Sequence, residues 1–150
     1  MFIVKQIEEV LEIIKTNFND YKIKTKEVKI EDSLHYMTVE DIYSLENVPH
    51  FNRSTVDGYA VSYASSKLAS SSTPSVLTLV GEVLMGQEST FTVTPSTTVY
   101  VPTGGHIPLW ADAVVMIENT DKLNNQIFIN KSVTINENVL SKATDISVGE

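Results

Sequence analysis

Residues 97–105 read Thr-Thr-Val-Tyr-Val-Pro-Thr-Gly-Gly, a β-branched and aromatic run that ends on a proline and two glycines. A run of this composition, stopped by turn residues, is typical of a short strand. Three further runs of the same kind are flanked by glycine, proline or asparagine: residues 76–80, 113–117 and 126–129. Short strands at such spacing predict a small barrel or sandwich.

The N-terminal part of the chain has a different pattern. Residues 2–18 predict an amphipathic helix, because apolar side chains recur at helical spacing with charged ones between them. These apolar positions are Val4, Ile7, Leu11, Ile14 and Phe18. Residues 21–30 alternate lysine with apolar residues and favour a short exposed strand or extended segment. Residues 30–42 return to a helix-like pattern, so the fold class we predict is α+β.

The amino-acid composition excludes several classes of partner and chemistry. The chain has 150 residues and 42% apolar residues, and its net charge is −8. This acidity argues against a nucleic-acid partner, because such binding depends on clustered lysine and arginine. The absence of cysteine excludes disulfides and thiolate chemistry. We expect a cytoplasmic protein with no membrane partner, since no apolar run is long enough to span a bilayer and the N-terminus lacks a signal-peptide pattern.

The first candidate site is the segment 51–61. Its Asp-Gly pair suits a tight turn, and local chemistry alone favours a simple hairpin leading into residues 59–61. Ser54, Thr55 and Asp57 nevertheless gather three oxygen-bearing side chains beside that turn. Such a group could hold a hydrated cation. Both interpretations remain open on these residues alone.

The second candidate site is the Thr-Gly-Gly loop at residues 103–105. Glycines leaving a strand expose backbone N–H groups, and such a nest can receive an anion. The loop lacks the lysine and the spacing of a P-loop, so it does not predict ATP binding in that mode. A glycine-rich turn without a ligand is the alternative, and His106 is the histidine closest to this loop.

Five groups of motifs occur in order along the chain, of which residues 28–42 are the first and residues 80–83 with Gly86 are the third. Residues 54–61 read Ser-Thr-Val-Asp-Gly-Tyr-Ala-Val, residues 103–105 read Thr-Gly-Gly, and residues 111–115 read Ala-Asp-Ala-Val-Val. Residues 137–139 read Glu-Asn-Val, and Asp145-Ile146 follows. Together these segments resemble the molybdopterin molybdenumtransferase family, which comprises the MoeA proteins and the gephyrin E domain. The resemblance covers nearly the whole chain.

The resemblance implies a domain plan. Residues 1–45 would begin the helical part of a MoeA-like domain I, which stays incomplete, and residues 46–138 would form the β-rich, barrel-like domain II. Residues 139–150 would be a truncated return into domain I. Members of the family continue into further domains, so we expect this chain to be the N-terminal part of a longer protein and to be inactive alone.

The resemblance also implies a reaction and its residues. The family inserts molybdate into adenylylated molybdopterin in molybdenum cofactor biosynthesis, releasing AMP, with a divalent cation such as Mg²⁺ involved. Asp57 and Thr103 match its catalytic positions, and Asp57 is the possible Mg²⁺ ligand. The positions implied for substrate or oxyanion binding are Ser54, Gly104, Gly105 and Asp145. The full-length protein would be a homodimer whose site is completed by a partner subunit.

Some positions depart from the family pattern. Trp110 stands where the family usually has glycine, and Leu140 stands where it has arginine. Thr144 replaces a usual glutamate, which weakens the role implied for Asp145. Two other functions stay open: a non-catalytic protein-interaction module on the same fold, and a paralogue that handles tungstate.

Overall fold

The computed structural model describes residues 4–20 and 22–150. The chain divides into two compact units, Met1–Ile42 and Tyr43–Glu150. Within the described residues, no helix combines the length and the apolar character that a membrane crossing needs.

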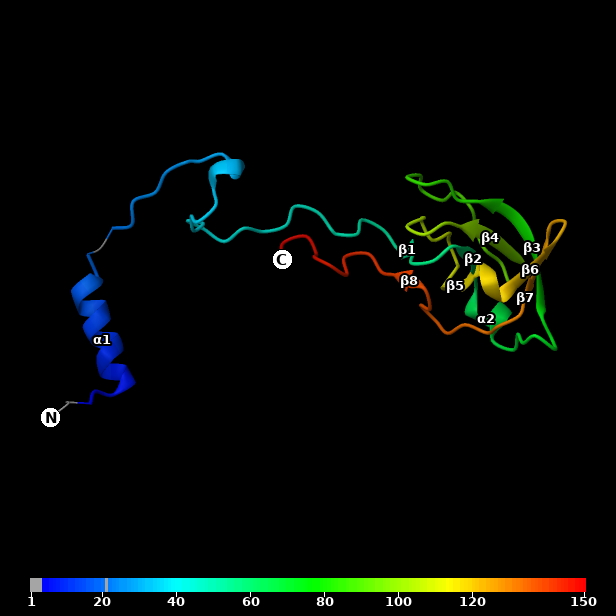
Figure 1. Ribbon diagram of the computed structural model, residues 1–150, viewed down its shortest axis with the longest axis horizontal. Helices are drawn as coiled ribbons and strands as arrows, with labels where there is room; N and C mark the ends of the chain where they lie inside the picture. Colours follow the sequence, from blue (N-terminus) through cyan, green and yellow to red (C-terminus); the bar gives the residue numbers. More distant parts are fainter. Residues whose placement is uncertain (1–3, 21) are drawn as a thin grey trace. The chain divides into compact units, whose positions relative to one another are not determined.

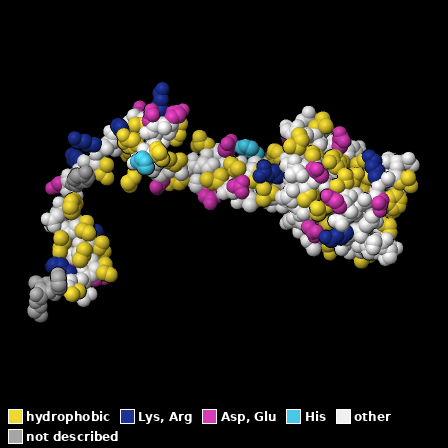
Figure 2. Space-filling view, viewed as in Figure 1, with side chains coloured by type: hydrophobic (Ala, Val, Ile, Leu, Met, Phe, Trp, Pro, Cys, Tyr) yellow, Lys and Arg dark blue, Asp and Glu magenta, His cyan; other side chains and the backbone are white. Residues whose placement is uncertain are grey.

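The first unit contains the helix α1 (Ile7–Phe18). The predicted amphipathic helix is therefore confirmed over these residues, while its residues 2 and 3 lie outside the described ones. Acidic residues in the first turn and Lys15 in the last turn suit the helix dipole. None of the α1 side chains is buried, and Figure 2 shows hydrophobic side chains exposed along it.

The helix predicted over residues 30–42 is wrong. Only a single 3-10 turn, η1 (Ile30–Asp32), forms there. The Ser33 hydroxyl donates a 2.7 Å hydrogen bond to the Ile30 carbonyl, and His35 has a φ of +71°. A serine that bonds back to the chain and a left-handed residue both stop a helix. Residues 22–29 form neither helix nor strand, and their side chains are exposed.

The second unit is built from strands (Figure 1). Its elements are β1 (Arg53–Ser54), β2 (Gly58–Val61), α2 (Tyr63–Ser66), β3 (Ser75–Glu82), β4 (Thr97–Val101), β5 (Ala113–Met116), η2 (Ile117–Asn119), β6 (Thr120–Leu123), β7 (Gln126–Ile129) and β8 (Val139–Leu140). All four strands predicted from the sequence are present, as β3, β4, β5 and β7. The predicted α+β class is confirmed.

Six of these strands form one sheet, in the order β5-β2-β4-β3-β7-β6. Only the β3–β4 pair is parallel. A flat sheet of this width would separate its edge strands by about 24 Å. The edges β5 and β6 are joined by η2 alone, which spans at most about 14 Å. The sheet therefore has to curl into a half-barrel, as the predicted barrel-like architecture requires.

Alternation along the strands creates two apolar clusters on opposite faces of the sheet. The larger cluster includes Val61, Val115, Ile127 and Ile129. The smaller one contains Ala60, Val83, Val93, Val99 and Val101. Every residue of β2 is buried, because β2 lies inside the sheet and packs on both faces. The core therefore encloses β2 on both faces.

The last residues of the chain pair with the segment that enters the sheet. β8 lies antiparallel to β1, and Val48 and Ile146 form a further bridge. Two asparagine side chains hold this ladder: Asn52 Oδ1 accepts from the Lys142 N–H at 2.8 Å, and Asn47 Oδ1 accepts from the Val148 N–H at 3.0 Å. The two segments run side by side in Figure 1.

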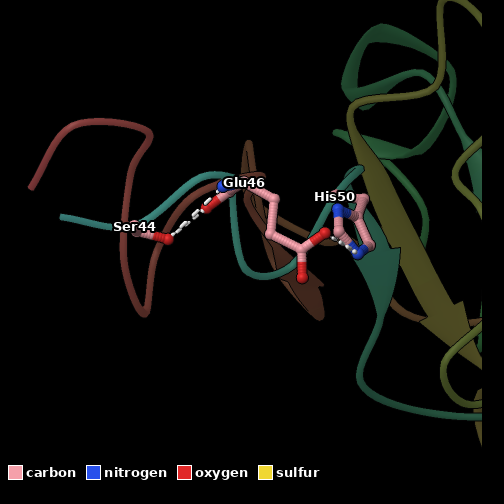
Figure 3. A network of polar contacts seen from close by, with 3 residues as sticks. All are labelled: Ser44, Glu46 and His50. Carbon is pink, nitrogen blue, oxygen red and sulfur yellow. Dashed lines mark hydrogen bonds and ion pairs between the residues drawn. The ribbon is translucent and has the colours of Figure 1, made fainter. Parts of the chain in front are cut away.

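A small polar network lies at the start of this ladder (Figure 3). The Ser44 hydroxyl donates to the Glu46 carbonyl at 2.7 Å, and His50 Nε2 lies 3.8 Å from Glu46 Oε2. Both side chains of the His50–Glu46 pair are mostly exposed, so this pair contributes little stability.

Replacing Asn52 by alanine is expected to loosen the C-terminal segment locally. The substitution removes the acceptor of the Lys142 N–H, and a hydrogen bond of this kind contributes about 1 kcal/mol. Amide hydrogen exchange in residues 142–150 should therefore accelerate about fivefold, while exchange in β2 and β4 stays unchanged. Asn130→Ala is the matched control. Unchanged exchange in residues 142–150 would contradict this role.

Candidate functional site

The candidate site centres on the Asp57 carboxylate. Asp57 Oδ1 accepts two hydrogen bonds from one residue, from the Thr103 N–H at 2.7 Å and from the Thr103 hydroxyl at 2.9 Å. The backbone bond, followed by the hydroxyl bond, lowers the pKa of Asp57 below its ordinary value of 3.8. The two hydrogen bonds thereby fix an exposed carboxylate in position and favour its ionised form.

Strand pairing brings these two residues together across 46 positions of sequence. β2 and β4 are antiparallel, with Gly58 opposite Val101. Asp57 immediately precedes β2 and Thr103 follows the end of β4, so both lie at the same end of the sheet. On the other side of β2, Gly58 permits the close approach of β5, because a Cβ there would lie 2.1 Å from the Val115 carbonyl oxygen.

The Thr-Gly-Gly loop closes around the chain itself. Its three N–H groups are all engaged: Thr103 donates to Asp57, Gly104 donates to the Ser54 carbonyl at 2.8 Å, and Gly105 donates to the Pro102 carbonyl at 2.8 Å. Gly104 has a φ of +82°, which suits glycine. The anion that the loop receives in this structure is the Asp57 carboxylate. Oxyanion binding by Gly104 and Gly105 stays a prediction, and it would need these hydrogen bonds to open.

Ser54 is buried beside the same loop. Its hydroxyl donates to the Val56 carbonyl at 2.5 Å and accepts from the Val56 N–H at 3.2 Å. The Ser54 N–H donates to the Gly105 carbonyl at 2.9 Å. In this geometry Ser54 shapes the turn that carries Asp57, and its contact with a substrate stays a prediction.

The structure thus brings together five of the six site residues that the family resemblance implies: Ser54, Asp57, Thr103, Gly104 and Gly105. Asp145 lies elsewhere, in the C-terminal ladder, where its N–H donates to the Val48 carbonyl at 2.9 Å. Its side chain is exposed. The binding role implied for Asp145 stays a prediction.

The donor set at this site suits a partly hydrated cation. Among the described residues, no cluster of three or more histidine, aspartate or glutamate side chains could hold a metal. Asp57 Oδ1 is taken by Thr103, while the described residues give Oδ2 no hydrogen bond. Mg²⁺ commonly binds through one or two carboxylates and keeps several waters. The Asp57 carboxylate therefore fits as a single Mg²⁺ ligand.

Three side chains near Asp57 were not predicted from the sequence: Tyr59, Glu82 and Tyr100. Tyr59 lies opposite Tyr100 across β2 and β4, and their rings pack edge to face with their centroids 5.7 Å apart. Burial raises the pKa of Tyr100, and the nearby Asp57 and Glu82 charges raise it further. Strand register decides this placement, and no signal in the sequence gives the register.

His106 lies at the edge of the loop. Its ring packs 4.8 Å from the Phe51 ring, and its Nε2 is 3.9 Å from Glu88 Oε1. The aromatic contact and the Arg53–His106 bridge hold the loop against β1. His106 is thus a packing residue in this structure.

Replacing Thr103 by valine is expected to raise the Asp57 pKa part of the way toward 3.8. The variant loses the hydroxyl bond but keeps the larger cause, the backbone N–H bond. A lowered folded-state pKa stabilises the protein above the unfolded pKa, and this stability is lost as the pH falls through the folded pKa. Carbon-13 NMR titration of the carboxyl group measures the shift. Thr92→Val is the control, and an unmoved Asp57 titration in Thr103→Val would contradict the assignment.

Comparison with known proteins decides the family. The family model for the MoeA N-terminal region (domain I and II) matches residues 5–150. The chain belongs to this family. The match includes the strands, the Asp57 turn and the Thr-Gly-Gly loop.

Curated relatives of this MoeA-family chain carry the name molybdopterin molybdenumtransferase. The Staphylococcus epidermidis protein is 30% identical over 129 residues, which cover 86% of this chain and 31% of the relative. The Staphylococcus aureus protein is 32% identical over 123 residues, covering 82% of this chain and 29% of the relative. The chain therefore spans about a third of the length of these relatives.

Solved structures of relatives share the fold. Two crystal structures of the molybdopterin biosynthesis MoeA protein from Pyrococcus horikoshii each superpose with a TM-score of 0.77. One is 30% identical and covers 83% of this chain and 33% of its own. The other is 36% identical and covers 99% of this chain and 37% of its own. The MoeA fold is therefore shared at substantial sequence identity.

Proposed function

We propose that this chain supplies the Asp57–Thr103 part of the active site of a molybdopterin molybdenumtransferase. The intact protein would insert molybdate into adenylylated molybdopterin and release AMP, in the cytoplasm. The names of the relatives support the reaction. The observation that carries the proposal is the exposed Asp57 carboxylate, which Thr103 fixes with two hydrogen bonds.

Charge gives Asp57 its role in this proposal. Molybdate and the substrate phosphates are anions, and a carboxylate repels them unless a cation lies between. Mg²⁺ on Asp57 Oδ2 would supply that positive charge and orient the oxyanions. Thr103 holds the carboxylate in position and keeps it ready to bind the ion. Asp57 is thus a metal-binding residue and Thr103 its positioning partner.

The surrounding loop gives the site its rigidity. Gly104 and Ser54 join the loop to the turn through the Gly104 N–H and the Ser54 carbonyl. Preorganised groups of this kind stabilise charge without reorganising during the reaction. We propose that Ser54, Gly104 and Gly105 act by holding Asp57 and Thr103 in position.

This chain holds only part of the proposed site. It covers about a third of its relatives, and one carboxylate does not complete a metal site among the described residues. We propose that the intact protein is a homodimer in which a partner subunit completes the site, and that the 150-residue chain alone does not turn over substrate.

Complementation tests the proposed function. A bacterial strain lacking its own molybdenum-insertion step should regain molybdoenzyme activity when it expresses the intact protein. The same strain expressing only residues 1–150 should not. Failure of the folded intact protein to restore activity would refute the proposal. The sequence does not separate molybdate from tungstate, because the two oxyanions share shape and charge. Growth of the strain with tungstate in place of molybdate tests whether the protein handles tungstate.

A non-catalytic interaction module is the second candidate. The observation that favours it is the exposed apolar face of α1, where Leu11 and Phe18 are 52% and 64% exposed. An isolated helix of 12 residues is marginal in water and gains stability from packing that face on a partner. If this function holds alone, Leu11→Glu abolishes partner binding while Asp57→Asn has no cellular effect.

A further inference from the structure

A second feature lies at the same end of the half-barrel as Asp57. An open groove of about 650 Å³ lies among Tyr59, Leu79, Glu82, Tyr100, Ile117 and Lys122. We refer to it as the mouth groove. Mouths of β-barrels are common places for small-molecule sites, which combine apolar walls with a few polar groups.

The strand register places the mouth groove beside Asp57. Tyr59 follows Asp57 by two residues and pairs with Tyr100. The Ile117 N–H donates to the Asp57 carbonyl at 3.1 Å, so a wall of the groove is attached to the Asp57 turn. A molecule in the groove would therefore lie next to the candidate metal-binding carboxylate.

The walls of the mouth groove favour a flat ring. Tyr59 and Tyr100 form an edge-to-face pair with an interplanar angle of 71°. Leu79 and Ile117 add aliphatic surface to the lining of the groove. Tyr59 is only 4% exposed, so Tyr100 is the ring on which an aromatic ligand would stack and bury apolar surface. A bare phosphate has no apolar face to place there, and a sugar lacks an aromatic ring.

The polar groups of the mouth groove specify the edge of that ring. Glu82 offers a carboxylate acceptor, whereas Lys122 and the Tyr100 hydroxyl are donors. Within residues 4–20 and 22–150, neither Glu82 nor Lys122 forms an ion pair. Asp57 and Glu82 together outnumber the single cation Lys122, which disfavours an anionic group in the groove.

We propose that the mouth groove binds a flat, amino-substituted nitrogen heterocycle. The amino group donates to Glu82, ring nitrogen or carbonyl acceptors face Lys122 and the Tyr100 hydroxyl, and the ring packs on Tyr100. Adenine and pterin share this chemistry, and adenylylated molybdopterin contains both. The identity of the ligand rests on the proposed function, whereas the class of ligand rests on the groove.

Ligand titration of the 150-residue chain tests this inference. Adenosine, 6-hydroxymethylpterin and ribose 5-phosphate are added separately, while NMR follows the methyl groups of Leu79 and Ile117. We expect saturable shifts with at least one of the two heterocycles. Stacking on an aromatic side chain contributes enough that Tyr100→Ala should weaken binding about tenfold.

Two further variants keep the test independent of folding. Tyr100→Phe retains the ring but loses the hydroxyl donor, so it should weaken binding less than Tyr100→Ala does. Lys122→Ala removes an exposed donor and should weaken binding several-fold, while Lys131→Ala, an exposed lysine outside the groove, should not. Equal binding by Lys122→Ala and the control would contradict the assignment of Lys122.

The outcomes show which end of the substrate supplies the heterocycle that binds in the groove. Binding of adenosine alone assigns the groove to the adenylyl end of the substrate, binding of the pterin alone assigns it to the pterin end, and binding of both supports the shared chemistry. Absence of groove shifts with either heterocycle, or equal shifts with ribose 5-phosphate, overturns the inference. The titration measures binding and no turnover. If the groove binds a heterocycle but the intact protein fails complementation, the proposed function is rejected and the inference about the groove stands.

Discussion

Alanine at Gly58 is expected to destabilise the half-barrel by about 3 kcal/mol or more, the upper end of the cost of overpacking. The new Cβ would lie 2.1 Å from the Val115 carbonyl oxygen and 3.0 Å from a Val114 methyl group. The closest atoms belong to the backbone of β5, so they cannot rotate away as a side chain could. β5 must separate from β2, which breaks pairing along an inner strand of the sheet.

Urea unfolding of the wild type and Gly58→Ala measures this effect. Gly86→Ala is the matched control, because Gly86 has a φ of +73° but nothing within 4 Å of its Cβ position. The control should lose only about 1 kcal/mol, the cost of a left-handed alanine. Equal losses of unfolding free energy in the two variants would show that the close approach of β2 to β5 does not restrict the size of the side chain at position 58.

Asparagine at Asp57 is expected to lower the rate of cofactor formation by the intact protein about 100-fold or more, as loss of one preorganised charge-stabilising group does in other enzymes. The amide oxygen of asparagine still accepts hydrogen bonds from Thr103, so the turn should persist. The variant loses the negative charge that would bind Mg²⁺. The change therefore tests the charge separately from the fold.

The dependence on Mg²⁺ gives this prediction a second readout. The Asp57→Asn variant should need a higher Mg²⁺ concentration for half-maximal rate than the wild type. Glu88→Gln, which removes a charge from an exposed glutamate outside the turn, is the matched control. A rate within threefold of the wild type, at unchanged Mg²⁺ dependence, would rule out Asp57 as the metal-binding group.

The strands were predictable because their signals are local. β-branched runs bounded by glycine, proline or asparagine gave β3, β4, β5 and β7, and the residues at the alternating inward positions of β7, Ile127 and Ile129, are fully buried. The family motif also marked an unusual backbone position. Trp110 stands where the family usually has glycine, and its φ is +64°.

What the sequence did not show has physical causes beyond local pattern. Residues 30–42 have helix-like spacing, but the Ser33 hydroxyl and the left-handed His35 end the turn after η1. Oxyanion binding by the Thr-Gly-Gly loop stays a prediction, because nothing tests it. The fold brings Asp57 and the Ser54 carbonyl to the N–H groups of this loop, and the sequence pattern did not predict these contacts. Contacts between residues far apart in the chain decide both the closed loop and the mouth groove.

Release of AMP from adenylylated molybdopterin by the intact protein tests the central claim most directly. The account predicts release that requires both molybdate and Mg²⁺, that falls about 100-fold in Asp57→Asn, and that is absent with the 150-residue chain alone. Molybdate-dependent release at the wild-type rate by Asp57→Asn, or no release by the folded wild-type protein, would contradict it.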